Sequence, residues 1–202
     1  LSIVAILSLI LFFVFTVRFL MPVHVVRELL DRVKAEDLLS ENFAEGASYR
    51  KRLQSIEDIT SSCVRRGDYA TAQDLIGLVR EKMDNILTVV NEKIRADSEK
   101  PFVRLVVYMS KPFAKLFEGI AISSNKNDAI EITIDVIRAI EDFVENFGEA
   151  RFIPAFKIFD EAIERIRSQA KHRFSTEEYA VDLARLEVAI ASARVSFSEF
   201  VG

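Results

Sequence analysis

Hydrophobic residues recur every three or four positions along most of the chain, whereas the strict alternation typical of a β-strand is never sustained. A stripe with this spacing allows a helix to bury one face against its neighbours. Such stripes run near residues 69–90, 128–147, 156–170 and 179–200. The segment 128–147 carries two of them, one through Ile130, Ile134, Ile137, Val144 and Phe147 and the other through Ile132, Val136, Ala139 and Phe143. The pattern predicts an all-α fold in which the helix at 128–147 is central.

Helix start and stop signals divide the striped segments into pairs. In RRGDYATAQ, Gly67 is expected to end one helix and Asp68 to cap the next one. Pro101 and Pro154 suit the first turns of two later helices, where a missing backbone N–H has no consequence. The sequence therefore predicts about three antiparallel helix hairpins, as a bundle or a short helical-repeat array, near residues 48–96, 101–147 and 152–201.

The first 21 residues, LSIVAILSLILFFVFTVRFLM, form the most apolar stretch of the chain, with no charge between Leu1 and Val17. A helix extended to Met21, with Arg18 reaching the headgroups, matches a hydrocarbon core of about 30 Å at about 1.5 Å per residue. A buried core helix would show a polar stripe, and a signal peptide would end in a small-residue cleavage site. Residues 1–21 are therefore predicted to form a transmembrane helix. The chain begins with Leu rather than Met, so we expect further sequence upstream.

The orientation of this span follows from the charges after it. Arg18, Arg27, Arg32 and Lys34 lie close to its end, and positive charge favours the cytoplasmic side. Cys63 is the only cysteine, so no intrachain disulfide can form, which suits a reducing compartment. The net charge of −4 argues against a nucleic-acid partner. We expect the C-terminal domain to be cytoplasmic.

An amphipathic juxtamembrane helix is predicted at residues 22–38, followed by a linker at 39–47 and the helical domain at 48–202. The stretch RFLMPVHVVRELLDRVKAEDL, residues 18–38, resembles the first helix of a HAMP-type signal-relay linker. Pro22 follows the span, an apolar stripe continues after it, and Asp37-Leu38 stand at the acidic-apolar pair of that family. Glu36 replaces the usual glycine, and the Asp-Glu-Ile-Gly stretch of the second helix is missing. The resemblance implies a helix that relays a signal from the membrane to the domain.

Candidate catalytic and metal-binding groups are few. Two histidines, His24 and His172, and one cysteine cannot supply four His/Cys metal ligands. The isolated glycines form no phosphate-binding loop. Cys63 lies near Arg65 and Arg66, which would lower a thiol pKa, although a lone cysteine on a helix is usually a core residue. His172 suits the end of a helix, where cations interact well with the dipole. No catalytic, cofactor-binding or metal-binding residue is predicted.

Two further features each allow two interpretations. Glu131, Asp135 and Asp142 form the acidic edge of the helix at 128–147, either as the carboxylate cluster of an enzyme or, as we favour, as a solvated face. The segment 101–125 mixes aromatic and basic residues, as in an interfacial helix on a membrane surface, but also fits a core helix kinked at Pro112. We favour the core interpretation.

The sequence is best explained by a membrane-anchored, non-enzymatic helical scaffold or regulatory signal-relay protein. Its predicted partners are the lipid bilayer, through residues 1–21, and another protein or a second copy of the chain. One alternative is the last span and cytoplasmic domain of a channel or transporter subunit. A second is an enzyme that uses the carboxylate cluster.

Overall fold

The computed structural model describes residues 6–10, 12–13, 21–34, 43–95, 100–123, 129–146, 152–174 and 177–201. All regular structure in this part of the chain is helical, which confirms the predicted all-α class. The principal elements are α2 (Pro22–Asp31), α4 (Phe43–Arg66), α5 (Tyr69–Arg95), α6 (Lys100–Ala121), α7 (Ala129–Asn146), α8 (Ile153–Arg173), the 3-10 helix η2 (Glu177–Tyr179) and α9 (Ala180–Val201).

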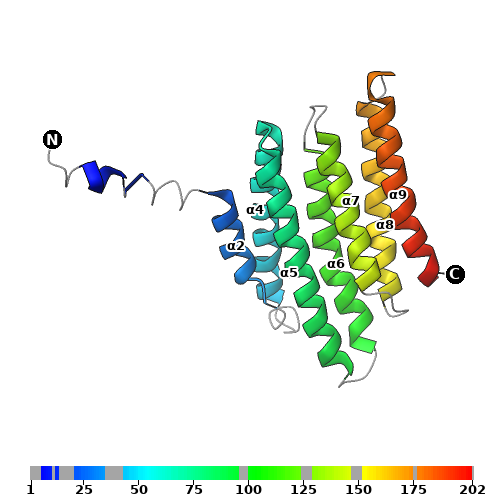
Figure 1. Cartoon of the computed structure of the whole chain (residues 1–202). Helices are drawn as coiled ribbons and strands as arrows, with labels where there is room; N and C mark the ends of the chain where they lie inside the picture. Colours follow the sequence, from blue (N-terminus) through cyan, green and yellow to red (C-terminus); the bar gives the residue numbers. More distant parts are fainter. Residues whose placement is uncertain are drawn as a thin grey trace.

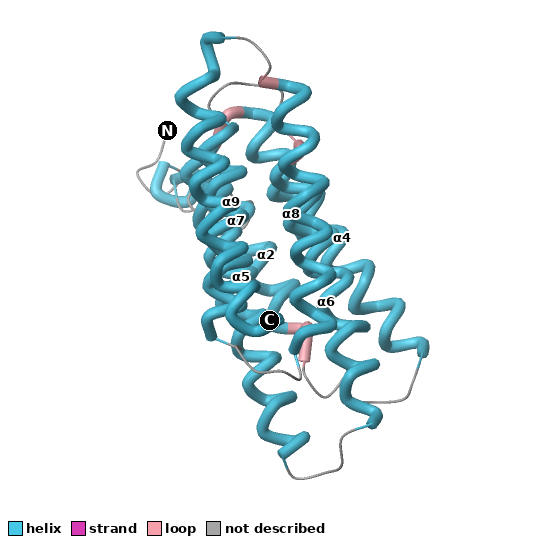
Figure 2. Tube along the Cα trace, turned by 90° about the vertical axis from the view of Figure 1, so that its right-hand side faces the viewer, coloured by secondary structure: helices cyan, strands magenta, loops and turns pink. Residues whose placement is uncertain are grey.

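The described helices form three hairpins, α4–α5, α6–α7 and α8–α9, which stack side by side as Figure 1 shows. Each hairpin contributes one helix to each of two layers. Figure 2 views the stack from its side, with α5, α7 and α9 overlapping in one layer and α4, α6 and α8 in the other. The predicted hairpins are therefore confirmed. The short helix α2 lies at one end of the stack, against α4 and α5, and α9 lies at the other.

The turn between α4 and α5 has the geometry that its sequence predicts. Gly67 adopts a φ of 78°, which glycine tolerates because it has no Cβ. Its N–H donates to the carbonyl of Val64 at 3.0 Å, and the N–H of Asp68 donates to that of Cys63 at 3.0 Å. This pair of hydrogen bonds is the Schellman motif, which satisfies the last carbonyls of a helix. The Asp68 carboxylate then accepts the N–H of Thr71 at 3.3 Å, so Asp68 caps α5.

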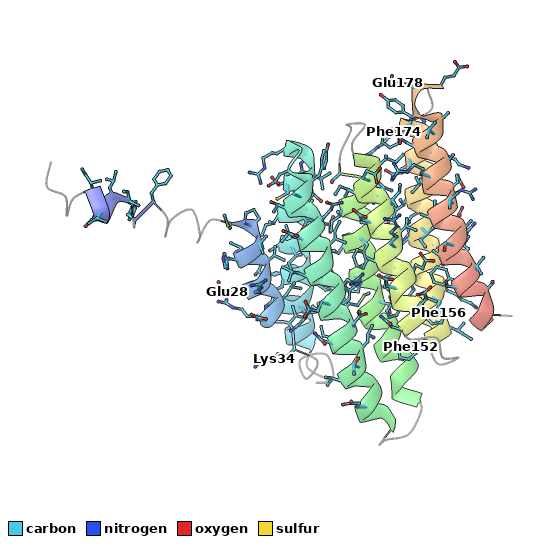
Figure 3. The ribbon with its side chains drawn as sticks, in the orientation of Figure 1. Glu28, Lys34, Phe152, Phe156, Phe174 and Glu178 are labelled. Atoms are coloured by element: carbon cyan, nitrogen blue, oxygen red, sulfur yellow. The ribbon has the colours of Figure 1, made fainter. Side chains whose placement is uncertain are left out.

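The helix α7 is the centre of the fold, as its two stripes predict. It contacts α5, α6, α8 and α9, and the described positions of both stripes are buried. Phe143 of α7 joins this helix to α8, because its ring centroid lies 4.9 Å from that of Phe159 and 6.1 Å from that of Phe156, both on α8. Phe156 in turn meets Phe197 of α9 at 6.0 Å (Figure 3 labels Phe156 and its neighbour Phe152). Both faces of α7 are therefore covered.

The described side chains of α6 support the core interpretation of the segment 101–125. Phe113, Leu116, Phe117 and Ile120 are buried between α4, α7 and α8, and Pro112 lies inside the helix. The rings of Phe113 and Tyr49 meet edge to face, with their centroids 6.2 Å apart.

The N-terminal elements differ in length from those that the pattern predicts. The helix α2 ends at Asp31 rather than at residue 38, although residues 35–38 lie outside the described part. A guanidinium N–H of Arg52 on α4 donates to the carbonyl of Arg32, which satisfies one carbonyl just after this helix. The helix α4 begins at Phe43, inside the predicted linker 39–47. The first hairpin is thus longer than predicted.

The predicted span at residues 1–21 lies largely outside the described part of the chain. Residues 6–10 and 12–13 are helical and exposed, and residue 21 directly precedes α2. Among the residues that the structure describes, none of the helices has both the length and the apolar character needed to cross a membrane. The span therefore stays a prediction.

The central place of α7 gives the first testable expectation. Ile137 is fully buried, so Ile137→Ala should lower the free energy of unfolding by about 2–5 kcal/mol through lost burial and a residual cavity. Its neighbour Arg138 is exposed, and Arg138→Ala should change that free energy by less than about 1 kcal/mol. Urea unfolding followed by circular dichroism measures both. Equal losses in the two variants would contradict the position of α7.

Candidate functional site

The acidic edge of α7 faces two different helices. On one side, Asp135 accepts a hydrogen bond from the side-chain amide of Gln73 at 2.6 Å, and Asp142 pairs with Arg80. Gln73 and Arg80 both belong to α5, and they lie seven residues apart, as Asp135 and Asp142 do. These contacts therefore join α5 and α7 at two points that lie seven residues apart along both helices.

On its other side, α7 is joined to α9. Glu131 accepts hydrogen bonds from both terminal guanidinium nitrogens of Arg185, the one from Nη2 at 3.1 Å, and Glu141 accepts a hydrogen bond from the hydroxyl of Ser192. The three carboxylates proposed as an enzymatic cluster are thus distributed over two interfaces, each with its own donor. Within the described residues, no group of three or more His, Cys, Asp or Glu side chains could hold a metal ion. These contacts connect α7 to the helices on both of its sides.

A shallow groove of about 610 Å³ runs between α5 and α7 over these contacts. It is open to solvent, with Gly77 on one side and the partly exposed Arg80–Asp142 pair across it. Its lining consists of Gln73, Ile76, Gly77, Arg80, Asp135, Arg138, Ala139, Glu141, Asp142 and Glu145. Four carboxylates and two guanidiniums make the groove acidic, which suits contact with a basic surface.

Among the described residues, Asp84, one turn beyond Arg80 on α5, has a strongly perturbed carboxyl group. Its pKa is raised from the ordinary 3.8 to about 6, mainly by burial, which outweighs the lowering by Arg80, with a smaller upward contribution from Asp142. Its Oδ1 is buried and makes no hydrogen bond. Asp84 was not among the residues that the sequence pattern singled out. A signal was present, because Asp84 lies three positions before the buried Leu87, which places it at the edge of the buried face.

The opposite layer carries a second groove, of about 470 Å³, across α4, α6 and α8. Glu57 reaches over α6 here, and burial raises its pKa while Lys115 lowers it. A Cβ at Gly119 would lie 2.5 Å from the Glu57 Cδ. The absence of a side chain at residue 119 therefore makes room for the Glu57 side chain at its observed position. Arg165 donates to Glu118 at 2.8 Å and connects α8 to α6. Opposite charges are again paired between helices.

Cys63 lies in the core, and His172 lies at the end of α8. Cys63 is fully buried, and burial raises its pKa, which outweighs the lowering by the hydrogen bond from Arg66 at 3.7 Å. The nearby arginines therefore do not activate the thiol, and the core interpretation is confirmed. His172 is exposed in the last turn of α8, between Lys171 and Arg173.

No protein-family model, no curated protein and no solved structure matches this chain. The resemblance of residues 18–38 to a HAMP-type linker therefore stays a prediction. Function has to be inferred from the chain's own contacts.

The environment of Asp84 predicts a pH-dependent stability. Its pKa is raised in the folded state, so the charged form destabilises the fold above about pH 6, and this penalty disappears as the pH falls towards 4. We expect Asp84→Asn to be more stable than the wild type by about 1–3 kcal/mol at pH 7 and to lose that advantage near pH 4. Urea unfolding across this pH range measures the difference.

The matched control for this test is Asp74→Asn on the same helix, because Asp74 is exposed. Its effect should stay within about 0.5 kcal/mol at both pH values. An Asp84→Asn variant that gains no stability at pH 7, or gains equally at pH 4, would show that Asp84 is not buried as described.

Proposed function

We propose that this chain is a membrane-anchored, non-enzymatic helical scaffold that relays a signal between the bilayer and protein partners. Residues 1–21 would cross the membrane, and the hairpin array would lie in the cytoplasm. The observation that carries this proposal is the packing of α2, which directly follows the apolar segment, onto both helices of the first hairpin.

The exposed apolar residues near the N-terminus support an anchor. Ile6, Leu7, Leu9, Ile10, Phe12 and Phe13 are each between 49% and 70% exposed. Solvated side chains of this size, one after another, are unfavourable in water and favourable in lipid. The basic residues that follow them favour a cytoplasmic array, because positive charge is retained on that side.

The geometry of α2 supports a relay. This ten-residue helix begins at Pro22 and buries Val26 and Leu30 against α4 and α5, and Val33 is buried just after it. Its other side is exposed, and Figure 3 shows Glu28 there, where it pairs with Arg32. A displacement of the segment before Pro22 would therefore act on the first hairpin through packed side chains.

The polar surface of the array supports a binding role over a catalytic one. The carboxylates of α7 are engaged by Gln73, Arg80 and Arg185, and the described grooves are open and lined by paired charges. Catalytic groups need enclosure and a positioned acid or base, whereas open, charged grooves suit contacts with other proteins. The acidic groove between α5 and α7 is the proposed partner surface on the array.

The anchor can be tested by extraction. We expect the full chain to sediment with membranes, to resist carbonate and to dissolve in detergent. Leu9→Arg with Phe13→Arg should release it, because each arginine costs about 2.5–3.5 kcal/mol at the centre of a span. Both side chains are exposed, so the array should remain folded.

The matched control for extraction is Leu9→Val with Phe13→Leu, which keeps the segment apolar and should remain in the membrane fraction. A wild-type chain that is soluble and monodisperse without detergent would refute the anchor.

The relay requires that α2 stays packed. Leu30 is 3% exposed, so Leu30→Ala should release α2 and speed tryptic cleavage after Arg27 by roughly tenfold or more, as expected for a loss of 2–5 kcal/mol in local packing. The exposed Asp31→Ala, on the same helix but away from the cleaved bond, is the control and should leave the cleavage rate unchanged within about twofold. Gel analysis of timed digests measures both. Equal cleavage rates in wild type and Leu30→Ala would mean that α2 is not held by this contact.

A further inference from the structure

The outer face of α9 carries an unusual apolar ridge. Val181, Val188 and Val195 are 73%, 70% and 60% exposed and lie seven residues apart. Ala184 and Ala191, also exposed, lie between them at the intervening heptad positions. We call these five residues the valine ridge. It lies on the side of α9 opposite the buried face formed by Leu186, Ile190, Ala193 and Phe197.

Polar side chains of α9 border the valine ridge on both sides, and each is engaged by a neighbouring helix. Towards α7, Arg185 and Ser192 contact Glu131 and Glu141; towards α8, Glu187 meets Arg167 and Lys171, and Arg194 meets Asp160 and Glu164. An apolar strip bordered by fixed polar groups is typical of an interaction surface. A helix that is apolar on two opposite sides is normally covered on both.

The two ends of the array differ in this respect. The helix α2 covers the first hairpin at one end, whereas no described helix lies beyond α9 in Figure 1. Stacked helical units normally end in a helix with a polar outer face, because that face meets water. The helix α9 departs from this rule along its whole ridge.

We propose that the valine ridge pairs with the same ridge of a second copy of the chain, with the two α9 helices antiparallel. In this pairing each valine meets a small residue, because Val188 lies beside Ala191 of the second copy, Val195 beside its Ala184 and Val181 beside its Ser198. A large side chain then fills the space above a small one in every layer. Parallel pairing would instead set valine against valine and alanine against alanine, which leaves voids at the alanine layers.

The charges beside the ridge fit the same arrangement. In an antiparallel heptad pair, the positions that flank the core on one side meet their counterparts on the other helix. Glu187 would therefore face Arg194 of the second copy, and the two-fold axis repeats this attraction. On the other flank Arg185 would face the neutral Ser192. No like charges among the described residues are brought together.

The size of the ridge determines the strength of the dimer. From Val181 to Val195 it is about 21 Å long at about 1.5 Å per residue, and it involves one helix from each copy. That is less surface than the roughly 800 Å² per partner of a standard interface. We therefore expect a reversible dimer with a Kd in roughly the micromolar range. This dimer goes beyond the proposed membrane anchor and does not require it.

Cysteine cross-linking tests the pairing directly in the full chain in detergent. Cys63 is buried, so the wild-type chain is the control without a cross-link. Ala184→Cys and Val195→Cys should each fail to form disulfide dimers alone, because identical positions lie about 16 Å apart along the antiparallel axis at about 1.5 Å per residue. A mixture of the two variants should form them.

A second, non-covalent test uses sedimentation at about 100 µM, well above the Kd expected for an interface of this size. We expect the wild type to be dimeric and Val188→Glu to be monomeric with unchanged circular dichroism. Val25→Glu, an exposed valine on α2, is the control and should remain dimeric.

Either test can overturn the proposal. A cross-link from Val195→Cys alone would show that the two α9 helices pair in parallel. A wild-type chain that is monomeric at this concentration would show that the valine ridge binds a different protein and not a second copy. A Val188→Glu variant that dimerises like the wild type would exclude the ridge from the interface.

Discussion

The burial of α7 on two faces is the constraint on which the rest of the array depends. Ile137 and Phe143 are both fully buried, and covering them requires helices from the hairpins on either side. A single helix hairpin cannot supply this cover, because each of its helices buries only the face turned to its partner. Stacking three hairpins in two layers solves the problem, and the polar edge of α7 then joins α5 and α9 through carboxylate contacts.

A stack of this kind places its distinctive surfaces at its ends. At one end, α2 is packed onto α4 and α5 and continues from the apolar N-terminal segment. At the other end, α9 exposes the valine ridge. The centre contributes the buried core and an acidic groove, while the two ends carry the proposed attachments. In this account, the membrane acts on the first hairpin and the second copy acts on the last.

Local features of the sequence were sufficient to predict the helices and their pairing. Apolar spacing determined which face of α8 is buried, and Gly67 with Asp68 located a turn that the structure reproduces. Contacts between distant segments could not be predicted, because they depend on how the hairpins stack. Arg80 meets Asp142 from 62 positions away, and Asp84 is half-buried at a position where Asp142 of α7 contributes to its raised pKa. The valines of α9 were visible in the sequence, but a helix apolar on two sides does not reveal which side remains open.

Native-state hydrogen exchange of the full chain in detergent tests the central place of α7 most directly. Amides buried in the middle of α7 should exchange only through global unfolding and should be the slowest in the protein. Protection should fall towards α2 at one end and, at concentrations below the Kd of the dimer, towards α9 at the other, because each end helix of a single copy has neighbours on one side only. The opposite result, with α4–α5 or α8–α9 protected more strongly than α7, would show that the hairpins fold as independent units and would contradict this account.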